Sequence, residues 1–351
     1  MKSIEGGDLR QGGSFSGCLS LLEVEISSSV PSIGNHAFRG CSSLINAKIS
    51  SSVTTIGNCA FCGCISLTTM KLPSALKSIG SSAFSGCSSL TTVEIPSSLT
   101  EISDHLFDGC TSLSSFSIPH SIKMIGNCAF YGCSSIKNIS IPSSVTIIGK
   151  SSFAECSSLE DIVIPSYITS IGSYAFEGCN SLTRIEIPSS VTVLESGCFS
   201  KCSNLKSIGI HSNLITIESN VFSKCSSLLS IELPSSVTSI EKESFLECQS
   251  LKKIVIQSSI LSIGPRCFSG CSSLEEIEIP ESLTTIGNHA FRECSRIEKI
   301  EIPKTVSSIG LGAFYGCSSL EQISIPNSFE PTYIGIPAGV NVIKIYIFFF
   351  F

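Results

Sequence analysis

The chain has few charged residues and no block of basic ones. Charged residues make up 14% of its 351 residues, and the formal net charge at pH 7 is −6. Proteins that bind nucleic acid or anionic lipid by electrostatic attraction need a basic surface, so we expect neither partner here. Low charge suits a stack of repeats whose neighbours cover one another.

Long apolar runs are also missing. Residues 1–14 are polar and glycine-rich, and they lack the apolar core of a signal peptide. The tail at 330–351 becomes apolar from Val340, but Lys344 interrupts it, and it is shorter than the roughly 20 residues that a membrane-spanning helix needs. We therefore expect no export signal and no membrane-spanning segment in this sequence.

What the chain does contain is a repeat of 23 residues. A phenylalanine stands three residues before each repeating cysteine, from Phe15 to Phe314. Such a period predicts a solenoid over residues 15–329, in which each repeat forms one coil. The cysteines of this column are Cys18, Cys41, Cys64, Cys87, Cys110, Cys133, Cys156, Cys179, Cys202, Cys225, Cys248, Cys271, Cys294 and Cys317.

One coil, from Cys87 to Gly109, shows the pattern within the repeat. Counted from the cysteine, apolar residues at +6 and +8 flank a variable residue, which predicts a short strand with one buried face. Proline at +9 ends that strand in ten coils. A second apolar pair at +12 and +15 predicts a very short strand on the opposite side, and the Ala-Phe-x-Gly-Cys segment predicts a helical turn. The expected fold is thus an α/β solenoid of about 14 coils.

Glycine at +16 is common but not constant. Ser103, Glu195, Glu218 and Glu241 occupy that position, so we expect no strict need for a left-handed backbone there. The column cysteines should point in parallel into one core layer, which does not present the dihedral angle of a disulfide. We interpret them as buried thiols that act as small hydrophobic residues.

Chemical motifs are weak. Cys59, Cys62 and Cys64 resemble a metal cluster, and His36 shares the +18 position with Cys59, but a closed zinc site needs four ligands and no second pair follows. No nucleophile–base pair or phosphate loop is evident. We expect no cofactor, no metal and no enzymatic activity, with a hydrolase or metal-dependent enzyme as the weakest alternative. Asn138 begins a glycosylation sequon that matters only if the chain is secreted.

The repeat resembles the BspA-like leucine-rich repeat. Residues 271–280 read C-S-S-L-E-E-I-E-I-P and residues 283–291 read L-T-T-I-G-N-H-A-F, and similar copies cover residues 15–329. The resemblance implies one continuous parallel sheet, no catalytic residues, and membership of a set of surface proteins implicated in adhesion. It favours a cell-surface or extracellular location, with a cytoplasmic scaffold for protein–protein interaction as the alternative.

Within that fold, residues at +5 and +7 should face outward from the sheet. Glutamates are prominent there toward the C-terminal end, and a broad repetitive strip favours a protein or glycan ligand over a small molecule. The alternative for each glutamate is that it only keeps a strand soluble. The candidate binding residues are Glu186, Glu232, Glu276, Glu278 and Glu301.

The C-terminal tail allows two interpretations. Residues 343–347 alternate well enough to add a closing strand, which would cover the last coil. Alternatively, residues 345–351 are an aggregation-prone remnant of a longer or altered reading frame. The sequence does not specify the ligand or the oligomeric state.

Overall fold

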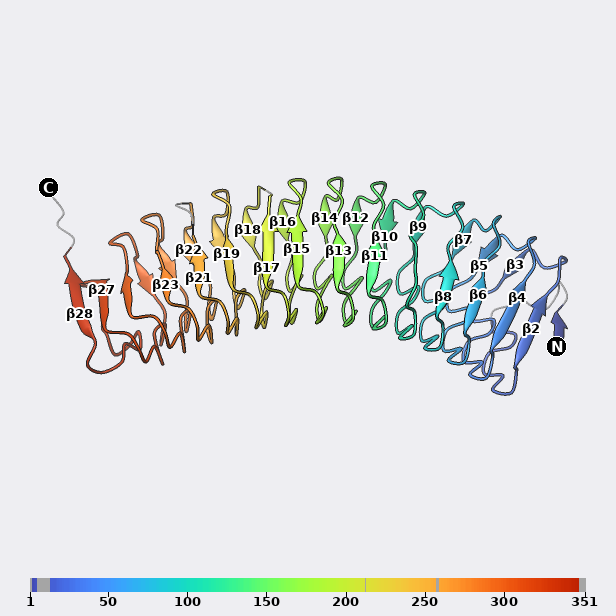
Figure 1. Cartoon of the computed structure of the whole chain (residues 1–351), viewed down its shortest axis with the longest axis horizontal. Helices are drawn as coiled ribbons and strands as arrows, with labels where there is room; N and C mark the ends of the chain where they lie inside the picture. Colours follow the sequence, from blue (N-terminus) through green and yellow to red (C-terminus); the bar gives the residue numbers. More distant parts are fainter. Residues whose placement is uncertain (1, 5–12, 212, 257–258, 347–351) are drawn as a thin grey trace. The chain divides into compact units, whose positions relative to one another are not determined.

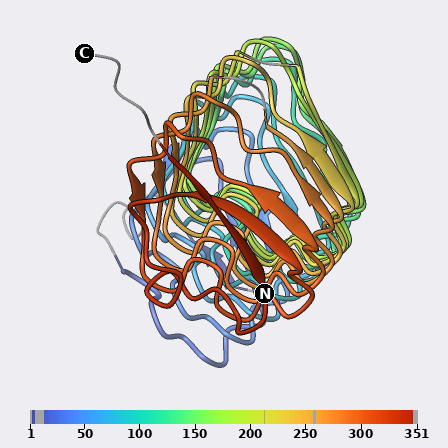
Figure 2. The same cartoon turned by 90° about the vertical axis from the view of Figure 1, so that its left-hand side faces the viewer.

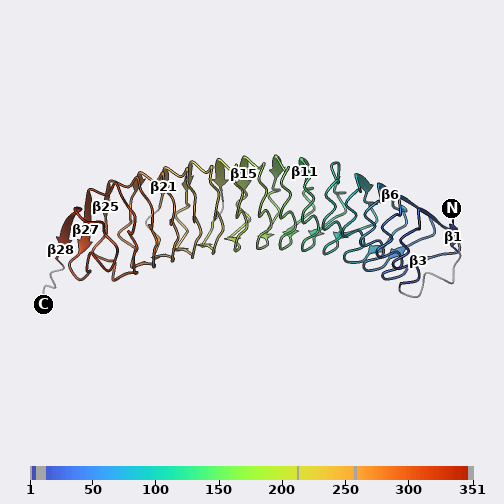
Figure 3. The same ribbon diagram turned by 90° about the horizontal axis from the view of Figure 1, so that it is seen from below.

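The computed structural model describes residues 2–4, 13–211, 213–256 and 259–346. The chain divides into two compact units, residues 1–182 and 183–351. In each unit one 23-residue repeat makes one coil, and successive coils follow one another with two rows of short parallel strands (Figures 1 and 3). We name these the first strand row, at about +5 to +8, and the second strand row, at about +14 to +15.

In the first unit the first strand row begins at the N-terminal strand. Residues Lys2–Ile4 pair with Glu23–Ile26, which adds a strand to the edge of the first coil. The strands of this row are β1 (Lys2–Ile4), β2 (Glu23–Ile26), β4 (Asn46–Ile49), β6 (Thr69–Lys71), β8 (Thr92–Glu94), β11 (Asn138–Ser140) and β13 (Asp161–Val163).

The second strand row of the first unit consists of two-residue strands. They are β3 (Ser32–Ile33), β5 (Thr55–Ile56), β7 (Ser78–Ile79), β9 (Glu101–Ile102), β10 (Met124–Ile125), β12 (Ile147–Ile148) and β14 (Ser170–Ile171). From β2 onward, partners along both rows of this unit are 23 residues apart, as Ile56 and Ile79 are, so the register of the sheet equals the period of the sequence.

The second unit repeats this arrangement. Its first strand row holds β15 (Arg184–Ile187), β17 (Ser207–Ile210), β19 (Ser230–Glu232), β21 (Lys253–Val255), β23 (Glu276–Ile277), β25 (Lys299–Glu301), β27 (Gln322–Pro326) and β28 (Asn341–Ile345). Its second strand row holds β16 (Val193–Leu194), β18 (Thr216–Ile217), β20 (Ser239–Ile240), β22 (Ser262–Ile263), β24 (Thr285–Ile286) and β26 (Ser308–Ile309).

The expected helical turn is wrong, and with it the α/β description: the described residues contain no helix. The corner that carries the phenylalanine is a series of turns. In the corner at 36–40, the N–H groups of His36 and Phe38 donate to the next coil, at Asn58 O and Ala60 O. In an α-helix, each of these N–H groups would donate to the carbonyl oxygen of the residue four positions earlier. The positive φ of His36 (57°) and Gly40 (69°) interrupts helical geometry in addition.

The first strand row is also not one continuous sheet, which corrects what the resemblance implied. In the first unit the ladder stops after β8, and a single bridge, Thr92 to Ser115, joins the next coil. That coil has Phe116 at +6, where neighbouring coils have Val93 and Ile139. Its larger ring packs edge-on against two phenylalanines, and we attribute the break to this change of size. In the second unit the row divides into three sheets.

Each unit has a dry core in which the column phenylalanines stack. From Phe38 onward these side chains are almost completely buried, and neighbouring rings lie 5.2 to 5.9 Å apart, nearly parallel. In the cartoon seen from the C-terminal end, the backbone of each coil winds around an interior (Figure 2). Offset-stacked rings at such distances are favourable, and each buries a large apolar area. The solenoid predicted from the period is therefore confirmed within each unit.

The column cysteines do more than fill space. The Sγ of Cys64 donates to the carbonyl oxygen of Phe38 at 3.2 Å, and Cys156 repeats this contact with Phe130 at 3.1 Å. The same carbonyl of Phe38 accepts the N–H of Cys41 at 3.2 Å. Each thiol thus ties its coil to the preceding one through a buried hydrogen bond, which explains why cysteine rather than alanine recurs.

Glycine at +16 is explained by close approach and not by a positive φ. At Gly57 an added Cβ would lie 2.6 Å from Asn35 Oδ1, the atom that accepts the N–H of Asn58 at 2.7 Å. Where serine stands at that asparagine position, a larger residue follows at +16: Ser196 precedes Glu218 and donates to it at 2.9 Å. The size of the residue at +17 in one coil therefore limits the size of the residue at +16 in the next coil.

Candidate binding face

The outward side of the first strand row is named here the strand face. Strands such as β19 and β25 alternate exposed, buried, exposed, because successive side chains of a strand point to opposite sides. The buried residue enters the core of the coil, and its two neighbours are left outside. This alternation places the +5 and +7 positions on one surface, as expected from the sequence.

All five predicted glutamates are exposed on the strand face of the second unit. Four of them lie in strands: Glu186 in β15, Glu232 in β19, Glu276 in β23 and Glu301 in β25. Glu278 follows the end of β23. We call Glu186, Glu232, Glu276, Glu278 and Glu301 the acidic strip. The structure places these residues on the same side of four coils of the second unit.

Glu186 is neutralised by its neighbours. Its carboxylate lies 3.1 Å from Arg184 Nη2 and 2.8 Å from His211 Nε2. His211 is 25 residues away, and the contact is possible because Gly209, the +7 residue of the next coil, has no side chain. A Cβ at Gly209 would collide with the Glu186 carboxylate.

Glu276 has a weaker partner. The Nζ of Lys253, on the neighbouring strand β21, lies 3.5 Å from its carboxylate, and both side chains are more than half exposed. Exposed pairs of this kind contribute little to stability and can exchange partners easily. The carboxylate of Glu276 is therefore open to a competing cation.

The other three carboxylates are without a cation. No lysine, arginine or histidine among the described residues lies within 4.0 Å of Glu232, Glu278 or Glu301. Among the described residues, no cationic side chain of the same unit pairs with these three carboxylates. They are therefore the members of the acidic strip best able to bind a positively charged group of a partner.

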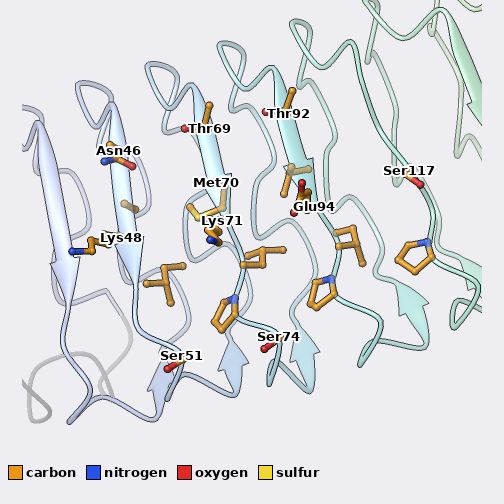
Figure 4. Close-up of a pocket in the computed structure, with 18 of the residues that line it drawn as sticks. Asn46, Lys48, Ser51, Thr69, Met70, Lys71, Ser74, Thr92, Glu94 and Ser117 are labelled. Carbon is orange, nitrogen blue, oxygen red and sulfur yellow. The ribbon is translucent and has the colours of Figure 1, made fainter.

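The first unit has a different strand face, which the sequence analysis did not select. A shallow groove of about 1230 Å³ lies over β4, β6, β8 and the adjoining coil. Lys48, Lys71 and Glu94 lie along it at +7, among the hydroxyl and amide groups of Thr69, Thr92 and Asn46 (Figure 4). The consecutive lysines at +7, Lys48 and Lys71, are the feature of the sequence that indicates this groove.

Lys48 and Lys71 differ in their surroundings. The Nζ of Lys48 lies 2.9 Å from Glu25 on β2, and this carboxylate raises the pKa of the Lys48 ammonium, first through the hydrogen bond and then through its charge. Lys71 has no carboxylate within ion-pair distance among the described residues. The groove therefore presents a positive group where the acidic strip presents negative ones.

The cysteines and histidine considered as metal ligands do not assemble into a site. Cys59 and Cys62 share one corner turn, but within the described ranges no three His, Cys, Asp or Glu side chains are placed to hold a metal ion. Cys64 belongs to the core column and donates to Phe38. Within the same residues, no helix has the length and apolar content that a bilayer crossing requires.

Comparisons with known proteins follow this geometry. A family model of the BspA type leucine rich repeat region matches residues 11–137, 123–252 and 238–348. A leucine-rich repeat protein from Bacteroides ovatus is 27% identical, with a TM-score of 0.72 over 98% of this chain and 87% of that one. A leucine rich cell surface protein from Faecalibacterium prausnitzii is 29% identical, with a TM-score of 0.55 over 97% and 87%.

A third structure shows the fold alone. The pneumococcal vaccine antigen PcpA is 18% identical, with a TM-score of 0.54 over 93% of this chain and 79% of that one. No protein of curated function matches the chain in sequence.

Proposed function

Because this chain belongs to the BspA-type leucine-rich repeat family, we propose that it is a non-enzymatic binding protein that presents its strand face to a protein or glycan partner. The observation that carries the proposal is the acidic strip, in which three carboxylates have no cation of their own among the described residues. Repeated exposed groups over successive coils form an extended surface, which suits a macromolecular ligand better than a small molecule.

Binding would be distributed over several coils. Each exposed carboxylate contributes little by itself, since exposed ion pairs are weak. Several contacts on one rigid surface add, because after the first contact the others form at a high effective concentration. Affinity should therefore depend on the number of coils engaged.

We place the protein at the cell surface. The support is the family together with the Faecalibacterium relative, whose name describes a cell surface protein. Labelling intact cells with a membrane-impermeant biotin reagent tests this: the native protein should be labelled without lysis. Labelling only after lysis would support the intracellular scaffold instead.

Binding itself is tested with the purified, fluorescently labelled chain on cultured epithelial cells. We expect saturable binding by flow cytometry that unlabelled chain competes away. Prior protease treatment of the cells should abolish binding to a protein partner, and glycosidase treatment should abolish binding to a glycan. Absence of saturable binding to cells, matrix proteins and glycan arrays would contradict the proposal.

The distributed mode has its own test. Removing residues 225–247, one coil in register, should leave a folded protein, because coils contact only their neighbours. We expect affinity for the cells to fall several-fold while circular dichroism stays that of a solenoid. Complete loss on removal of this coil, with the fold intact, would indicate a localised site in place of a distributed one.

A further inference from the structure

Two neighbouring cysteines in the first unit lie outside the buried column. Cys59 and Cys62 stand at +18 and +21 of one coil, in the corner turn, and both are only half-buried. The column thiols beside them, such as Cys64 and Cys87, are buried and donate to phenylalanine carbonyls. A reagent in solution can therefore reach this pair, while the column thiols from Cys41 onward are buried in the folded chain.

The backbone brings the two side chains together. The N–H of Cys62 donates to Cys59 O at 3.2 Å, which closes a turn over residues 59–62, and Cys59 has a φ of 53°. The ends of such a turn lie within about 7 Å of each other, the range that disulfides span. The two cysteines therefore stand at opposite ends of one turn, at the same corner of the coil.

The surroundings keep the Cys62 thiol protonated near neutral pH. Burial and the neighbouring Cys59 raise the pKa of the Cys62 thiol, against the opposing effect of Arg39 in the preceding coil. Because the thiolate is the attacking species, reaction should be slow at pH 7 and faster as the pH rises.

From this geometry we infer that Cys59 and Cys62 form a reversible dithiol–disulfide site, oxidised by low-molecular-weight disulfides. The thiolate of one cysteine attacks a sulfur of the small disulfide, and the other sulfur leaves and takes up a proton. The second cysteine then attacks the mixed disulfide, forms the Cys59–Cys62 bond, and releases the second small thiol. Two electrons and two protons pass from the cysteine pair to the small disulfide, which is reduced to two thiols.

The chain supplies matched controls. At +18 and +21 the next coil carries Ser82 and Ser85, so the corner accepts serine at both positions. Cys128 occupies the +18 position of another coil and is also half-buried, but Tyr131 stands at +21 there. Cys128 therefore has the place of Cys59 without a partner cysteine in its turn.

The test uses the folded, fully reduced chain incubated with excess glutathione disulfide at pH 8, followed by acid quenching, alkylation and peptide mass analysis. We expect the peptide with Cys59 and Cys62 to lose two hydrogen atoms and to regain them with dithiothreitol, while Cys128 carries a glutathione adduct. Cys59→Ser and Cys62→Ser should each abolish the internal disulfide and leave an adduct on the remaining cysteine.

Three results would overturn the inference. They are adducts on Cys59 and Cys62 without an internal disulfide, no reaction of either cysteine after prolonged oxidation, or loss of two hydrogens that persists in both serine variants. Circular dichroism of each variant, compared with the unchanged chain, confirms that the fold is retained.

Discussion

The +7 column of the first unit carries Lys48 and Lys71, whereas that of the second unit carries glutamate at four of its seven positions. Behind these unlike surfaces the interiors are alike. Phe84 in the first unit and Phe268 in the second stack on their neighbours at similar distances, and a thiol follows each phenylalanine in the core. The comparison separates two roles: the column that points inward holds the coils together, and the columns that point outward differ between the units.

The largest effect that should be common to both units is alkaline unfolding. Burial raises the pKa of Cys156 and of Cys271 to about 12, from 9.0 for an ordinary thiol. Between these values the unfolded chain binds fewer protons than the folded chain, so the free energy of unfolding falls as the pH rises above 9. The loss is about 1 kcal/mol per thiol from pH 9 to pH 10.

Five column thiols have a pKa of about 12, namely Cys64, Cys110, Cys156, Cys271 and Cys317. These five alone should lower the free energy of unfolding by about 5 kcal/mol over that step. The column thiols whose pKa is raised still further should add to this loss, and urea denaturation at pH 7, 9 and 10 measures it. Cys156→Ser and Cys271→Ser should reduce the slope equally. A free energy that stays constant from pH 8 to pH 10 would contradict a protonated, buried thiol column.

Removing one ring of the stack gives the next largest effect. Phe84→Ala and Phe268→Ala each leave a cavity and should cost about 3–5 kcal/mol. If the two interiors are equivalent, the two losses should agree within about 1 kcal/mol. Exposed Tyr131→Ala is the control and should change the free energy of unfolding little. A large difference between the two losses of free energy of unfolding would show that the cores of the two units differ in stability despite their similar ring distances.

A smaller effect distinguishes the +16 position in the two units. Gly57→Ala places a Cβ against Asn35 and should cost about 1–3 kcal/mol, since the contact is with backbone and a fixed amide. Glu218→Ala, at the same position beside Ser196, removes one partly buried hydrogen bond and should cost about 1 kcal/mol or less. Thermal or urea unfolding measures both costs. If the two variants lose the same free energy of unfolding, Ser196 does not leave more room at +16 than Asn35 does.

The period alone predicts the stacked coils, the buried phenylalanines and the outward glutamates. In an exact repeat, residues at the same position of every coil have the same surroundings. The corner turn could not be predicted in the same way. Residues with positive φ there include His36, Cys59 and Ser82, which carry no glycine signal. A short Ala-Phe segment suits a helix locally, but hydrogen bonds to the next coil take its N–H groups.

The contacts of the acidic strip also lie beyond the period. The pairing of Glu186 with His211 depends on Gly209 between them, a departure from the consensus that has meaning only when coils are stacked. The break in the first strand row likewise follows from one large residue, Phe116. The repeat predicts the stacked coils, and residues that depart from the repeat, such as Gly209 and Phe116, accompany the local differences in contacts and strand pairing.

One measurement tests the central claim most directly: the affinity for epithelial cells of two triple variants with equal change of charge. Glu232→Gln, Glu278→Gln and Glu301→Gln neutralise the strand face of the second unit. Glu241→Gln, Glu247→Gln and Glu293→Gln neutralise exposed glutamates of the same unit away from that face. We predict that the first set weakens binding at least tenfold, about 1.4 kcal/mol, and that the second leaves it unchanged, with both proteins equally stable. Equal affinity of the two variants would contradict recognition through the strand face.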